Sequence, residues 1–180
     1  MLKSLFVKGT LLKILFACYL IFSSGLSFAQ NKDAVKYNNA IVGQQHKVVP
    51  HIVRFFETHA KHGCSLEKAM KEKERIETML DKGIVKIQAM KPYDGNDSLR
   101  QSGLKWLKIY KHTFDVDFET AIPLLSKKDK TEADKQKLKS IQESMFAEED
   151  KIDEEFELAQ WAFVKKYNLK MVELPLEPSK

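Results

Sequence analysis

Apolar side chains recur every three or four residues along most of this 180-residue chain, and no stretch alternates between apolar and polar residues as a half-buried strand would. This spacing is typical of the amphipathic α-helix, in which residues three and four apart share a face. Glycine and proline are scarce, with seven and five in the whole chain, so helix breakers are few. The pattern therefore predicts an all-α protein.

Four helical segments are predicted, over about Asp33–His62, Ser65–Lys91, Ser98–Ile122 and Glu132–Tyr167. The links between them are short, so consecutive helices are expected to run antiparallel. The predicted fold is an up-down-up-down four-helix bundle formed by residues 30–167. Residues 168–180 contain two prolines and are expected to form an extended or flexible tail, whose apolar residues Met171, Val172 and Leu174 are able to dock.

Two prolines lie within predicted helices. Pro50 removes a backbone hydrogen bond and its ring clashes with the carbonyl of His46, four residues earlier. We therefore expect the first helix to be kinked or broken between His46 and Pro50, and the third to end or kink at Pro123. Three helix starts carry N-cap signatures, at Ser65, at Ser98 with Gln101, and at Thr131 with Asp134.

The first 29 residues are typical of a cleaved export signal. Three lysines precede or interrupt an apolar run over residues 11–22, and Ser27 and Ala29 place small residues where signal peptidase cuts. The cut is predicted before Gln30, and the apolar run is shorter than the roughly 20 residues of a membrane span. A lipid anchor on Cys18 and an uncleaved anchor stay open as alternatives. The sequence thus predicts export, to the periplasm or to the cell surface.

Removing residues 1–29 takes away three lysines and no acid, which leaves 27 basic and 25 acidic residues. This near balance argues against a general nucleic-acid-binding protein, which needs a strongly basic face. No second long apolar run exists, so the sequence predicts no membrane span in the mature chain. The expected partner is a protein or a small ligand of the envelope.

His59, His62 and Cys64 form the clearest candidate metal site. The two histidines are three residues apart at the predicted end of a helix, and imidazole with thiolate suits Zn or Cu. A fourth ligand is not evident, so the alternative is a helix end at which histidine complements the helix dipole. Cys64 is also the only cysteine after the signal, and it either links two chains as a homodimer or is an idle thiol.

Three polar residues fall on apolar helix faces. Asn38 and Gln45 share the apolar stripe of the first helix, and Glu149 lies on the core line of the last helix. Buried polar groups are unfavourable unless they are hydrogen-bonded. We therefore expect Asn38, Gln45 and Glu149 to form a buried polar cluster, which fixes helix register or lines a small polar cavity.

The other acidic residues between Glu148 and Glu157 are expected to form a solvated face. They lack the spacing of a calcium-binding loop, and no Glu-x-x-His pair of a di-iron bundle is present. Haem-attachment, phosphate-loop, nucleophile-elbow and zinc-protease motifs are likewise missing from the chain. The sequence therefore predicts no catalytic residue and no cofactor beyond the Zn or Cu alternative.

The stretch Ala34-Val35-Lys36-Tyr37-Asn38-Asn39-Ala40-Ile41-Val42-Gly43-Gln44-Gln45 resembles the start of a family of exported helical surface proteins of spirochaetes and related bacteria. The signal ending Ser27-Phe28-Ala29-Gln30 is similar to signals of Bacteroidota. The resemblance implies an envelope location and a helical domain, and it brings no catalytic residues with it. The predicted function is an envelope binding or interaction protein; the alternative is a metal- or small-ligand-binding bundle using His59, His62 and Cys64, or a pocket near the Pro50 kink.

Overall fold

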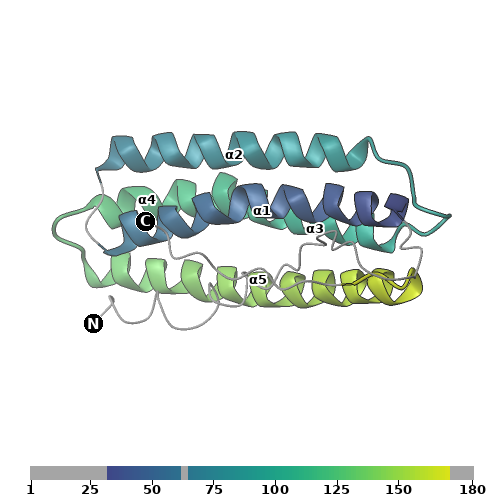
Figure 1. The fold of residues 1–180 in the computed structure, drawn as a ribbon. Coiled ribbons are helices and arrows are strands. Elements are labelled where there is room, and N and C mark those ends of the chain that lie inside the picture. Colours follow the sequence, from purple (N-terminus) through teal and green to yellow (C-terminus); the bar gives the residue numbers. More distant parts are fainter. Residues whose placement is uncertain (1–31, 62–64, 171–180) are drawn as a thin grey trace.

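The computed structural model describes residues 32–61 and 65–170. Their helices are α1 (Lys32–Lys61), α2 (Leu66–Gln88), α3 (Ser98–His112), the π-helical segment η2 (Thr113–Asp117), α4 (Phe118–Ser126) and α5 (Glu132–Lys166). Figure 1 shows that α3, η2 and α4 continue one another, so the described part forms four long helical units, each antiparallel to the preceding one. Within these residues there is no strand, only an isolated bridge between Tyr93 and Asn96. The predicted all-α antiparallel four-helix bundle is confirmed.

The helices are arranged so that α2 and α5 lie on opposite sides of the bundle, with α1 and α3 between them (Figure 1). The helix α3 contacts α1, α2 and α5. Gly103 permits its close approach to α1, because a Cβ atom at this position would lie 2.5 Å from Cγ2 of Ile41. A side chain there would push the two helices apart.

Apolar side chains from all the helices fill the interior, and aromatic rings gather toward both ends of it. At one end Phe55 of α1 meets Phe118 of α4, with ring centroids 4.9 Å apart. At the other, Tyr37 of α1 meets Phe163 of α5 at 5.6 Å. Each such pair adds about 0.5–1.5 kcal/mol beyond the burial of its surface. Both contacts join helices that are distant in the sequence.

The prediction of a break at Pro50 is wrong, because α1 runs without interruption from Lys32 to Lys61. Pro50 is exposed, so the hydrogen bond it removes is on the solvent side of the helix. Val48, Val49 and Ile52 are buried and hold the helix against the core. Pro123 is also exposed, and α4 continues past it to Ser126. The irregular stretch of the bundle is η2, which the sequence did not predict.

The helix starts agree only in part with the predicted caps. Thr131 and Asp134 form the predicted reciprocal capping box at α5. At α3 the N-cap is Asp97, so the predicted capping box of Ser98 and Gln101 is wrong. The Asp97 carboxylate instead accepts hydrogen bonds from the side chains of Arg100 and Gln101. The Asp97 side chain is longer than that of Ser98 and is charged, which favours these stronger, charge-assisted hydrogen bonds.

None of the helices that the structure describes is both long and apolar enough to cross a membrane.

Candidate functional site

The predicted metal site lies outside the described residues. His62 and Cys64 fall in the gap between α1 and α2, and only the backbone of His59 is described. Among the described residues, no group of three or more His, Cys, Asp or Glu side chains is placed to hold a metal ion. The metal site therefore stays a prediction.

The three polar residues predicted to be buried are buried, with exposed fractions of 0% for Asn38, 4% for Gln45 and 1% for Glu149. They do not form one hydrogen-bonded cluster. Oδ1 of Asn38 accepts a hydrogen bond at 3.5 Å from Nε2 of Gln160, a buried residue of α5. Oε1 of Gln45 and both carboxylate oxygens of Glu149 have no hydrogen-bond partner in the described part. Glu149 thus has neighbours other than those predicted.

Glu149 belongs to an acidic group between α3 and α5. The indole Nε1 of Trp106 donates a hydrogen bond of 2.7 Å to Oδ1 of Asp153. The Trp106 ring packs against Tyr110 with centroids 4.1 Å apart, and the Tyr110 hydroxyl, like the Glu149 carboxyl, is buried without a hydrogen-bond partner among the described residues. The sequence did not indicate that Trp106 and Tyr110 are neighbours of Glu149, because they lie on a different helix.

Burial is the main cause of the raised pKa values of Glu149 and Asp153. It raises the pKa of Glu149 to about 8, and the negative charges of Asp153, Asp150 and Asp117 add to the shift. Burial also raises the pKa of Asp153 to about 6, against the hydrogen bond from Trp106. Glu149 is therefore mostly protonated at neutral pH. Glu149 is closed off from solvent, and it makes this part of the core sensitive to pH.

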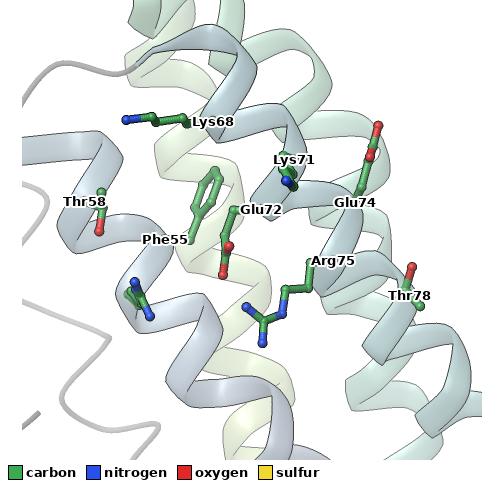
Figure 2. Close-up of a pocket in the computed structure, with 9 residues that line it drawn as sticks. Phe55, Thr58, Lys68, Lys71, Glu72, Glu74, Arg75 and Thr78 are labelled. Atoms are coloured by element: carbon green, nitrogen blue, oxygen red, sulfur yellow. The ribbon is translucent and has the colours of Figure 1, made fainter.

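The surface offers a more accessible site, a groove of about 630 Å³ between α1 and α2. We call it the α1–α2 groove, and nine residues line it: Arg54, Phe55, Thr58, Lys68, Lys71, Glu72, Glu74, Arg75 and Thr78. Figure 2 shows Phe55 and Glu72 between the two helices, with Lys68 and Arg75 extending from α2 toward α1. The groove arises because the helices meet along their apolar faces and leave polar residues along both margins.

The helical repeat explains why these side chains gather on one side of α2. Lys68, Glu72 and Arg75 are separated by four and three residues, so they share a face. Arg54 and Thr58 are likewise four apart on α1. Phe55 is 2% exposed and closes the bottom of the groove with an apolar ring. The arrangement combines an apolar floor with charged walls.

Positive charge dominates the walls, with four basic residues against two acidic ones. No ion pair is found for Arg54, Lys68, Lys71 or Arg75 among the residues that the structure describes. Oε1 of Glu72 lies 3.5 Å from Nδ1 of His51, which leaves the arginines unneutralised. A guanidinium binds a carboxylate through two parallel hydrogen bonds, so the groove is suited to carboxylate ligands.

Several other cations of the bundle already have partners. Nζ of the buried Lys73 lies 2.6 Å from Oε1 of Glu77 and 2.8 Å from Oε2 of Glu119. These hydrogen bonds outweigh burial and raise the pKa of Lys73. A second groove, between α3 and α5, has a volume of about 660 Å³, but its Lys105 is paired with Glu155. The α1–α2 groove therefore has the larger unmatched positive charge.

The chain matches no protein-family model, no curated protein and no solved structure. The resemblance of residues 34–45 to exported surface proteins stays a prediction.

Proposed function

We propose that this protein is an exported, non-catalytic binding protein of the bacterial envelope, whose α1–α2 groove holds an acidic segment of a protein partner. The observation that carries the proposal is the pair Arg54 and Arg75, which come from different helices and lack ion pairs in the described part. They border a groove whose floor is the ring of Phe55. Charge and apolar contact thus favour the same ligand, an acidic segment with one apolar side.

The shape of the groove favours an extended or helical segment over a compact small molecule. From Lys68 to Thr78 the groove follows eleven residues of α2, whose ends are about 15 Å apart along the helix. An amphipathic helix bound in such a groove places anchors three and four residues apart. Two carboxylates that are seven residues apart, as Lys68 and Arg75 are, match these two cations, while an apolar residue between the carboxylates meets Phe55.

Export is the part of the proposal that rests on the sequence. The basic start, the apolar run and the small residues before Gln30 support secretion. The resemblance to exported surface proteins supports an envelope location. A partner in that compartment is another exported protein or the exposed part of a membrane protein.

Fluorescence anisotropy with a labelled synthetic helix tests the groove. The probe is a short amphipathic peptide with glutamates at helical spacing and leucines on one side. We expect saturable binding that weakens as salt is raised, because exposed charges are screened. The double variant Arg54→Glu/Arg75→Glu should bind at least roughly tenfold more weakly, a loss of about 1.4 kcal/mol.

The matched control is Lys128→Glu/Lys139→Glu, which makes the same change of net charge at exposed residues outside the groove. It should bind the peptide as the unmodified protein does. Equal loss in both variants would show that only net charge matters, and unchanged binding by the arginine variant would refute the groove. Helical circular dichroism confirms that each variant is folded.

A further inference from the structure

The outward face of α5 exposes large apolar side chains that the core does not use. The side chain of Trp161 is 51% exposed, and that of Leu158 is 63% exposed. Three exposed acids, Asp150, Glu154 and Glu157, share this face at intervals of three and four residues. We call these five residues the α5 ridge. Its acids have no ion pair in the part of the chain that the structure describes.

The α5 ridge complements the α1–α2 groove in three respects. Its charge is negative where that of the groove is positive. From Asp150 to Trp161 it spans twelve residues, so its two ends are about 16 Å apart along the helix, which is close to the 15 Å of the groove along α2. It also presents Trp161 to a groove with the aromatic floor Phe55 and two guanidinium groups that have no ion pair in the described part, and guanidinium groups stack well on indole.

The two surfaces cannot meet within one molecule. The groove is formed with α2 and the ridge with α5, and these helices lie on opposite sides of the bundle (Figure 1). Two molecules can bring them together, with the ridge of one in the groove of the next. Such an interface is heterologous, so a pair keeps one unused groove on one copy and one unused ridge on the other.

We propose that the partner of the groove is a second copy of this chain, which inserts its α5 ridge. This proposal rests on the proposed function of the groove and names its ligand. Trp161 is expected to contribute most of the binding energy, since an exposed tryptophan often dominates an interface once a partner buries it. Glu154 and Glu157 face the arginines of the neighbouring copy. Further copies add in the same way, so the assembly lengthens as concentration increases.

Sedimentation velocity of the purified protein, in reductant to exclude disulfide linkage through Cys64, tests the proposal. We expect the weight-average mass to increase with concentration and to decrease with added salt. The groove variant Arg54→Glu/Arg75→Glu and the ridge variant Glu154→Arg/Glu157→Arg should each be monomeric, because each now sets like charges against each other. Trp161→Ala should weaken association at least roughly tenfold, and its control, Val85→Ala at an exposed apolar residue of α2, should not.

Mixing the groove variant with the ridge variant is the decisive measurement. The native ridge of the first meets the native groove of the second, so the mixture should associate although neither variant does so alone. A monomeric mixture, or a wild-type protein that is monomeric at every concentration, would overturn the proposal. If the acidic peptide still bound the groove in that case, the proposed function would stand with a different partner; if it did not bind, both would fail.

Discussion

At the scale of single residues, Glu149 is an unfavourable group for the core. It is 1% exposed, and neither carboxylate oxygen has a hydrogen-bond partner in the described part. A charged carboxylate in such a place is strongly destabilising, so the group binds a proton instead. Its position between Met145 and Ile152 is enough to predict that it is buried. Its neighbours Tyr110 and Trp106 belong to another helix, and the periodicity of one helix carries no information about them.

The buried carboxyl makes stability depend on pH. The pKa of Glu149 is about 8 in the folded protein, and its ordinary value, which applies to the unfolded chain, is 4.5. Between these two pH values the folded protein therefore holds a proton that the unfolded chain has lost. The free energy of unfolding therefore falls as pH rises from about 5 to about 8, by on the order of 3 kcal/mol from this group. Asp153, with a pKa raised to about 6, acts in the same direction at the acidic end of the range.

Glu149→Gln removes the titrating group while keeping the shape of the side chain. We expect this variant to be more stable than the unmodified protein at pH 8 and to lose much less stability between pH 5 and pH 8. Urea unfolding at both pH values measures the difference. Glu154→Gln, at an exposed position of the same helix, should keep the original pH dependence. Parallel pH dependence in the Glu149 variant and the unmodified protein would contradict the assignment.

At the scale of elements, the π-helical segment shows what a simple helical pattern misses. The buried residues Tyr110, Phe114, Phe118 and Ile122 follow one another at a constant interval of four. In an α-helix each such step passes a full turn by about 40°, so three steps drift by about 120°. A π turn takes in one more residue and returns these side chains to the core. This constant interval of four is visible in the sequence and could have predicted the π turn. The kink was instead predicted at Pro123, whereas the irregular segment is Thr113–Asp117.

The helix caps show a second limit of local patterns. Thr131 and Asp134 were predicted correctly, because their capping box depends only on residues of the same turn. The same spacing at Ser98 and Gln101 gave a wrong prediction, since Asp97 one residue earlier takes the N-cap position and binds Arg100. When two adjacent residues can both cap a helix, spacing alone does not choose between them.

Two substitutions separate the real cap from the wrongly predicted one. Thr131→Ala removes the acceptor for the backbone N–H of Asp134 and should lower the free energy of unfolding by about 1 kcal/mol. Ser98→Ala should change it by less than about 0.5 kcal/mol, because the Ser98 side chain is exposed and is not the cap. Urea unfolding under identical conditions measures both. A larger effect at Ser98 than at Thr131 would show that the caps are assigned the wrong way round.

At the scale of the whole molecule, the sequence was enough to predict the arrangement of the helices but not the groove on the surface between α1 and α2. Short links and helical spacing predicted four antiparallel helices, since these features are local. The α1–α2 groove depends on how two helices are rotated about their axes when they pack. Arg54 and Arg75 are ordinary solvent-facing residues within their own helices, and only the pairing of α1 with α2 places them along one groove.

Two glycines in helices test how closely α1 and α3 approach across the bundle. An added Cβ at Gly103 would lie 2.5 Å from Cγ2 of Ile41, which is fixed to a β-branched and therefore stiff side chain. An added Cβ at Gly43 of α1 would have nothing within 4 Å. The two substitutions bring the same gain in helix propensity, so any difference between them reports on packing.

Gly103→Ala should therefore lower the free energy of unfolding by about 1–2 kcal/mol, because the overpacking outweighs the gain in helix propensity. Gly43→Ala should raise it by about 0.5–1 kcal/mol, since it restricts the unfolded chain without a clash. Urea unfolding of both variants beside the unmodified protein gives the two values. If Gly103→Ala stabilised the protein as much as Gly43→Ala, the helices α1 and α3 would have to lie farther apart than the structure places them. The cross-section of the bundle, and with it the rotation of α1 that orients Arg54 toward the groove, would then have to be revised.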